Sequence, residues 1–197
     1  MKHRKNKKFN DIVITATDLF KKFGMKRVSI EEICKKGNVS KATFYKHFPN
    51  KNELIKYIFD TWFIEGYNEF DVIEKTDIPF TEKIKAILQI KRKFASNMSP
   101  EFIEEYVNMS NDLLPYFTEL KQRSFGRFLQ YLKKWQEEGY IRKSIKPEFI
   151  IQALESLEYF TKVESLPLLY DDYMSFVEEI LNFFFYGILS ERMGDEN

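Results

Sequence analysis

The stretch between residues 29 and 53 holds three helix-start signals, and no other feature limits the possible folds as strongly. Ser29 and Asn50 each precede a glutamate by three residues, the spacing of a capping box, in which the first side chain accepts a backbone N–H and the glutamate reaches back. Ser40 lies between them as a third cap. Helices that begin so close together must be short, so this stretch predicts small helices joined by tight turns.

Two breaks separate these helices. Gly37 and Asn38 end the first one, and Pro49 prevents the second from continuing. We expect Gly37 to supply the unusual backbone dihedrals of the turn, because glycine adopts them without a steric cost. The prediction is a helix from Ile30, the turn Gly-Asn-Val-Ser, and a helix over Lys41 to about His47, which together form a helix-turn-helix.

The second of these helices has two different faces. Phe44 and Phe48 are four residues apart and point the same way, toward a core. The remaining side chains face outward or sideways: Lys41, Ala42, Thr43, Tyr45 and Lys46. Small groups allow close approach to a major groove, Thr43 can contact a base edge or a thymine methyl, and Tyr45 and Lys46 can reach bases or phosphates. This face therefore favours DNA binding.

Two further positions suit phosphate oxygens. Lys51 and Ser29 lie at helix N-termini, where free amides and the helix dipole favour an anion. The alternative is a generic helical hairpin with solvated lysines, in which Thr43 and Tyr45 are ordinary surface residues and Ser29 is only a cap. The combination of caps, turn, proline break and phosphate-suited positions favours the DNA-binding interpretation.

The charge distribution points the same way. Residues 1–60 contain 15 Lys/Arg and six Asp/Glu, a net charge of +9, whereas residues 61–197 carry a net charge of −8. Chance clustering on solvated faces is the alternative. The size of the difference instead predicts a basic module that meets a polyanion and an acidic module with another task.

One specific resemblance runs from Ile12 to Ile58. Its elements are a first helix ending in Phe-Gly, a capped second helix, Gly-x-x-Ser, Thr-hydrophobic-Tyr-x-His-Phe and Lys-x-Glu-Leu, within "ATDLFKKFGMKRVSIEEICKKGNVSKATFYKHFPNKNELI". This stretch resembles the DNA-binding domain of the TetR family of bacterial transcriptional regulators. Asn38 is a small departure, since the family often has alanine or glycine beside the turn.

The resemblance implies which residues meet double-stranded DNA. The matching positions are Ser29, Ser40, Lys41, Ala42, Thr43, Tyr45, Lys46 and Lys51. His47 matches as well, with a helix-end or phosphate role and a core role equally expected. The resemblance also implies a palindromic operator, a homodimer, and a C-terminal part that can hold a small hydrophobic or aromatic ligand.

The rest of the sequence predicts an all-α fold, with an N-terminal three-helix helix-turn-helix domain and a C-terminal helical bundle. No strand-like alternation stands out. Apolar spacing, prolines and Gly24 and Gly139 as stops predict further helices at about residues 10–23, from 51 onward, 79–95, 100–109, 114–138, 147–163 and 171–190. We expect a DNA-binding domain over residues 1–50 and a ligand-binding and dimerisation domain over 51–197, linked by the helix from Lys51.

The final helix is apolar almost all round after Ile180, so it needs cover on two sides. A second copy of the chain can supply one side in a four-helix interface, and a two-fold protein matches palindromic half-sites. The alternative is a monomer with this helix at the centre of the bundle. The expected interface residues are Phe149, Ala153, Leu157, Phe160, Phe176, Ile180, Phe183 and Phe184.

Aromatic residues gather in the middle of the chain and can line a ligand cavity. The candidates are Trp62, Tyr67, Phe94, Tyr106, Phe117, Phe125, Phe128 and Glu155. For any one aromatic, a plain core position is the stronger alternative. Glu155 would suit a cationic ligand, because a carboxylate beside aromatic rings favours a cation.

Several other classes of protein are disfavoured. Cys34 is the only cysteine, expected as a small buried apolar residue, and His3 and His47 are too few and too scattered for a zinc site. No cofactor, metal or catalytic arrangement is expected. The sequence suggests no signal peptide, and the apolar run 180–189 is far shorter than the roughly 20 residues of a membrane span, so a cytoplasmic location is expected.

These observations predict a sequence-specific transcriptional regulator, a homodimeric repressor released from its operator by a small ligand. The alternative is a helix-turn-helix structural or interaction protein without ligand-controlled regulation. Activation instead of repression is also open.

Overall fold

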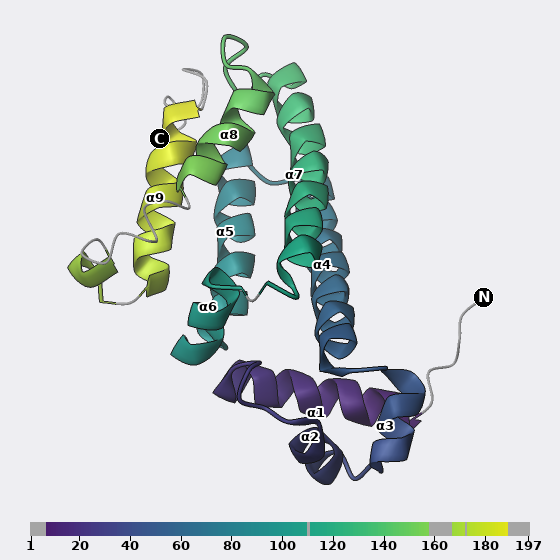
Figure 1. Cartoon of the computed structure of the whole chain (residues 1–197). Coiled ribbons are helices and arrows are strands. Elements are labelled where there is room, and N and C mark those ends of the chain that lie inside the picture. The colour runs from purple at the N-terminus through teal and green to yellow at the C-terminus, as the bar shows by residue number, and fades with distance from the viewer. Residues whose placement is uncertain (1–6, 110, 158–166, 172, 189–197) are drawn as a thin grey trace. The chain divides into compact units, whose positions relative to one another are not determined.

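The computed structural model describes residues 7–109, 111–157, 167–171 and 173–188. This part of the chain is helical and contains no strand, so the predicted all-α fold class is confirmed (Figure 1). The helices are α1 (Lys7–Phe23), α2 (Ile30–Lys36), α3 (Lys41–His47), α4 (Lys51–Lys75), α5 (Phe80–Ser96), α6 (Pro100–Val107), α7 (Leu114–Glu137), α8 (Pro147–Leu157) and α9 (Tyr173–Ile188), with a short 3-10 helix, η2 (Pro167–Leu169).

The chain divides into two compact units. The first holds the residues up to Glu69 together with Asn97–Leu120, and the second holds Phe70–Ser96 together with the residues from Lys121 on. Helices α4 and α7 therefore each contribute to both units. The division expected from the sequence, between residues 50 and 51, concerns DNA binding and ligand binding rather than compactness, and it stays a prediction.

The core of the first unit holds α1, α2 and α3 together. Helix α1 packs against α2, α3 and α6, and α4 adds its first turns to the same core. The largest fully buried side chains of this unit are Ile12, Phe20, Val28, Ile33, Phe44, Leu54 and Ile58. Burial of such side chains contributes about 1.5–3 kcal/mol each, so this core fixes the positions of the short helices that would not be stable alone.

The turn between α2 and α3 differs from the prediction. Gly37 has an ordinary helical φ of −78°, whereas Asn38 takes the left-handed φ of +48°. The expectation that Gly37 supplies the unusual dihedrals was wrong, because asparagine tolerates that region through its short polar side chain. Gly37 instead occupies a tight space: a Cβ there would lie 3.0 Å from the Ile33 carbonyl oxygen and 3.2 Å from Thr15 Oγ1. The stop predicted at Gly24 is confirmed by its φ of +79°.

The second unit has a separate aromatic core. Phe70 and Phe80 pack around Trp135, with ring centroids 6.0 and 5.1 Å from its own, and α9 packs against α5. The helix boundaries that the sequence predicts for this unit agree with the structure to within a few residues. The predicted extensions over residues 158–163 and 189–190 lie outside the described residues.

Candidate nucleic-acid interface

The three predicted caps are present and fix where each short helix begins. Ser29 Oγ accepts a hydrogen bond from the Glu32 amide at 3.1 Å, and Asn50 Oδ1 accepts one from the Glu53 amide at 3.0 Å. At the start of α3, Ser40 Oγ accepts the Thr43 amide at 3.1 Å. These side-chain acceptors satisfy backbone donors that a helix leaves unpaired at its N-terminus, so they stabilise the first turns.

Helix α3 is anchored on one side and presented on the other. Phe44 and Phe48 are buried in the core, as predicted from their spacing, and Val39 packs against the same core. The opposite side presents exposed Lys41, Ala42, Tyr45 and Lys46, with Thr43 partly exposed. A helix held in this way can enter a major groove without disturbing its own core, because the groove admits an α-helix.

The hydroxyls at the start of α3 already bond to each other. Ser40 Oγ and Thr43 Oγ1 lie 2.9 Å apart in a hydrogen bond. A hydroxyl can donate and accept at once, so each of them keeps capacity for a further partner. Their predicted contacts with DNA stay predictions.

His47 lies at the end of α3 against an aromatic group. Its ring meets Phe9 of α1 edge-on, with centroids 5.5 Å apart, and Phe9 stacks on Phe48 at 5.3 Å. The imidazole is half-buried. Of the two roles expected for His47, the packing role therefore gains structural support, while a phosphate contact stays a prediction.

Lys51 is occupied inside the chain. Its ammonium group donates to the carbonyl oxygens of Met25 at 2.9 Å, Lys26 at 3.1 Å and Val28 at 3.0 Å. An ammonium group has three protons, so all of them serve the α1–α2 loop. This geometry argues against the predicted phosphate contact by the Lys51 side chain, although the N-terminus of α4 keeps its dipole.

A carboxylate also binds the α1–α2 loop, through the backbone amides of that loop. Glu105 of α6 accepts from the backbone N–H groups of Met25 and, at 2.9 Å, Lys26. Lys51 and Glu105 therefore bind opposite polar groups of one loop, and burial lowers the pKa of Lys51. Sequence reasoning missed Glu105, because nothing local marks a contact across 79 residues.

Lys41 also has a partner within the chain. Its ammonium group forms an ion pair with Glu31 of α2, and this pair lowers the pKa of Glu31 and raises that of Lys41. Both groups are therefore charged at neutral pH. Lys46, by contrast, has no ion-pair partner among the described residues. The exposed face of α3 thus offers one free cation and one cation paired with a carboxylate that was not predicted.

The predicted ligand residues are divided between the two units. In the first unit, Trp62 and Phe117 pack at the edge of the core and Tyr106 stacks on Phe59. In the second, Phe125 and Phe128 pack against the other core, whereas Phe94 is exposed. Tyr67 contacts Phe63 at 4.8 Å, and Glu155 lies 3.9 Å from Lys121 in an ion pair. Their joint role in one cavity stays a prediction.

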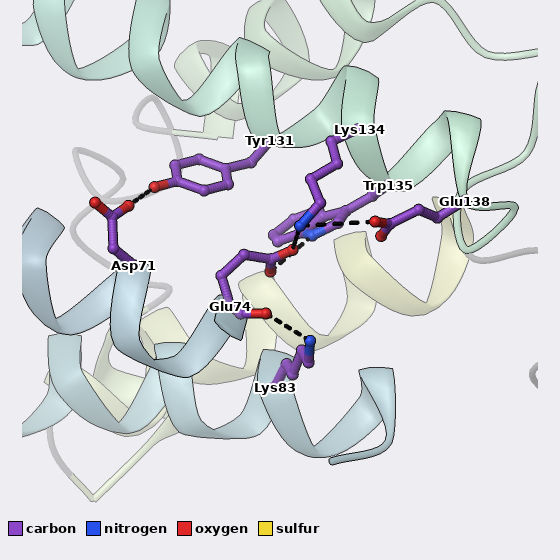
Figure 2. A network of polar contacts seen from close by, with 7 residues as sticks. All are labelled: Asp71, Glu74, Lys83, Tyr131, Lys134, Trp135 and Glu138. Atoms are coloured by element: carbon purple, nitrogen blue, oxygen red, sulfur yellow. Dashed lines mark hydrogen bonds and ion pairs between the residues drawn. The ribbon is translucent and has the colours of Figure 1, made fainter. Parts of the chain in front are cut away.

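A buried carboxylate joins α4 to α7 in the second unit (Figure 2). Glu74 is only 7% exposed, and it accepts from Lys134 Nζ at 2.6 Å and from Trp135 Nε1 at 3.0 Å. Asp71, one turn earlier, bonds to Tyr131 and, at 2.8 Å, to Arg127. These side-chain partners come from α7, and Lys83 of α5 donates to the Glu74 backbone carbonyl at 2.7 Å (Figure 2). The network therefore fixes the packing of these helices rather than forming an open polar site.

The predicted dimer residues differ in exposure. Phe149 on α8 is 60% exposed and Phe183 on α9 is 84% exposed, whereas Phe176 is 4% exposed and lies 5.5 Å from the Tyr170 ring. Phe176 therefore serves the core of its own chain. Ala153, Ile180 and Phe184 are half-buried, the side chain of Leu157 is not described, and Phe160 lies outside the described residues.

Two other features are absent from the part of the chain that the structure describes. No helix there combines the length and apolarity needed to cross a membrane. No three His, Cys, Asp or Glu side chains there come together as a potential metal site. Cys34 is a buried free thiol, as predicted.

Comparisons with known proteins agree with this geometry. The family described as "Bacterial regulatory proteins, tetR family" matches residues 12–58. The uncharacterised HTH-type transcriptional regulator YhgD of Bacillus subtilis is 29% identical over 140 residues, 69% of this chain and 71% of that protein. YvkB of the same organism, with the same description, is 25% identical over 70% of this chain and 72% of that protein.

Solved structures extend the likeness of fold over most of the chain. The fatty acid degradation regulator FadR from Bacillus halodurans aligns with a TM-score of 0.72 and 16% identity, covering 94% of this chain and 98% of that one. Reduced NemR of E. coli aligns with a TM-score of 0.71 and 14% identity over the same shares. With the family match, the related regulators and the anchored α3, residues 12–58 are a DNA-binding domain of the type found in the TetR family of bacterial transcriptional regulators.

Proposed function

We propose that this chain is a homodimeric repressor that binds a palindromic operator through α3 and leaves it when a small ligand binds the C-terminal part. The observation that carries the proposal is that α3 has one buried side and one exposed side. Phe44 and Phe48 are buried, while Tyr45 is 52% exposed beside the cationic Lys46. Side chains of this kind at the start of a recognition helix can read base edges, and the buried side keeps them in place.

Exposed apolar residues on α8 and α9 support the dimer. Phe149 and Phe183 would be costly to leave in water in a monomer, and they lie on α8 and α9, which both contribute to the core of the second unit. A two-fold dimer places two copies of α3 for half-sites about 34–36 Å apart. We expect Phe183→Glu to give a monomer in sedimentation equilibrium, and Val72→Glu, an exposed control on α4, to leave the dimer intact. A Phe183→Glu protein that sediments as the wild type would contradict this interface.

Helix α4 is the proposed link between ligand and DNA. Lys51 at its start bonds to the α1–α2 loop, and Glu74 near its end bonds to α7. A ligand that tilts α4 would therefore displace the module that carries α3. It acts only if it binds the misaligned state better than the aligned one.

The expected ligand is small and hydrophobic or aromatic, because the candidate residues are mostly aromatic. A compound that acts in this way should raise the melting temperature of the free protein and lower its affinity for the operator. A reporter gene behind the operator should then be transcribed more strongly with the ligand. Weaker transcription on deleting the gene for this protein would indicate an activator instead.

The direct test of the α3 assignment is a pair of substitutions. Tyr45→Ala and Thr43→Ala should each weaken binding to a selected operator by about 10- to 100-fold, the range expected for one good base contact. Binding to random duplex should change little. Val72→Ala is the matched control, since Val72 is exposed on α4 and belongs to the second unit rather than to the unit that holds α3. A footprint that neither α3 variant alters would refute the assignment.

A further inference from the structure

The ion pair between α2 and α3 lies where the proposed DNA contact would be made. Lys41 is the first residue of α3, and Glu31 is the second residue of α2. Their side chains are 56% and 60% exposed. In a helix-turn-helix the N-terminal residues of the recognition helix contact base edges, so this pair would face the groove rather than solvent.

Stability of the free protein does not account for the pair. Exposed ion pairs contribute little, because water screens them and two long side chains must be ordered. Core contacts between α2 and α3 already hold the two helices together through Ile33 and Phe44. A role in the complex with DNA therefore explains the pair better than stability does.

A carboxylate is an unusual group to bring to DNA. The other side chains assigned to this interface are hydroxyl, small, aromatic or cationic, and phosphate oxygens repel Glu31. A carboxylate is tolerated there if it accepts a hydrogen bond from a base. Cytosine N4 is the amino group that Glu and Asp accept from in the major groove.

Lys41 supplies the hydrogen-bond donor that complements the Glu31 acceptor. The major-groove edge of a G·C pair displays the acceptors N7 and O6 of guanine next to the N4 donor of cytosine. An ammonium group beside a carboxylate matches that edge, donor to acceptors and acceptor to donor. We propose that Glu31 and Lys41 act together as a specificity-determining pair that reads one G·C base pair in each half-site. This inference rests on the proposed binding of α3 in the major groove.

A selection from random-sequence duplexes with the full chain tests it. The variants are Glu31→Gln and Glu31→Ala, with Glu32→Gln as the matched control. Glu32 is the next residue of α2 and pairs with Lys36 of its own helix at 3.8 Å, and glutamine preserves its capping position. Circular dichroism should give all four proteins the same helical content and similar melting temperatures.

The wild type and Glu32→Gln should enrich the same palindrome, with a G·C pair whose replacement by A·T weakens binding by about 10- to 100-fold. Glu31→Ala should lose the preference at that position only. Glu31→Gln should shift it toward adenine, which glutamine binds through N6 and N7.

Two results would overturn the inference while leaving the proposed function intact. One is the same enriched palindrome, with the same G·C preference, for all four proteins. The other is uniformly tighter binding of both Glu31 variants to every duplex, which would make Glu31 only a competitor of phosphate for Lys41. If the wild type enriches no sequence, the proposed function fails and the inference fails with it.

Discussion

Replacing Lys51 by methionine removes three hydrogen bonds while keeping an unbranched side chain. The ammonium group donates to the carbonyls of Met25, Lys26 and Val28, which lie in the loop between α1 and α2. A hydrogen bond to a charged group contributes about 1.5–3 kcal/mol. The three bonds do not add fully, because water can reach the Lys26 carbonyl in the variant and because burial already disfavours the charged form. We expect Lys51→Met to lower the free energy of opening the first unit by about 2–4 kcal/mol.

Cys34 provides the assay. It is the only cysteine of the chain, it is buried in the core of the first unit, and burial raises the pKa of its thiol. A thiol reagent therefore reacts when this unit opens, at a rate set by the opening free energy if closing is fast. A loss of about 2–4 kcal/mol corresponds to about 30- to 1000-fold faster alkylation under native conditions.

Lys56→Met is the matched control. Lys56 also lies on α4, but it pairs with the partly exposed Glu53 at 2.8 Å rather than with the loop. Its removal should change the alkylation rate by no more than about threefold. If Lys51→Met reacts no faster than Lys56→Met, the carbonyl contacts do not stabilise the first unit and the reasoning is wrong.

Three further predictions concern other positions. Asn38→Ala should lower the opening free energy in the same thiol assay by about 1–2 kcal/mol, because alanine resists the left-handed φ, while Asn38→Gly should leave it nearly unchanged. Equal alkylation rates for these two variants would contradict this. Glu74→Ala should cost about 1–3 kcal/mol in urea titration, since it leaves a buried indole N–H unpaired, while the exposed Glu138→Ala should cost less than about 0.5 kcal/mol; similar midpoints would refute this role of Glu74. Lys46→Ala should reduce the salt dependence of DNA binding by about one unit, whereas Lys51→Met should not, and a reduced slope for Lys51→Met would restore its predicted phosphate contact.

The features that the sequence predicted well are local. Caps join atoms three residues apart, and the Phe44–Phe48 spacing sets the buried side of α3, so short patterns contain all the necessary information. Helix boundaries followed for the same reason from prolines and glycines. The exception was the turn after α2, where asparagine rather than the neighbouring glycine takes the left-handed conformation.

The features that the sequence did not predict depend on long-range packing. The contacts of Lys51 with the α1–α2 loop span up to 26 residues, those of Glu105 with the loop up to 80, and that of Glu74 with Trp135 spans 61. No periodicity or motif marks such pairs, because each is created when helices distant in sequence meet. The Glu31–Lys41 pair is closer in sequence, but its approach depends on the crossing of α2 and α3.

The central claim is that two copies of this chain read a palindromic operator through α3. The most direct measurement is a titration of the purified chain against a duplex enriched from random sequences, with binding and stoichiometry recorded at one fixed salt concentration. The account predicts two chains per duplex and an affinity at least about 1,000-fold above that for a scrambled duplex. One chain per duplex, or equal affinity for both sequences, would contradict it.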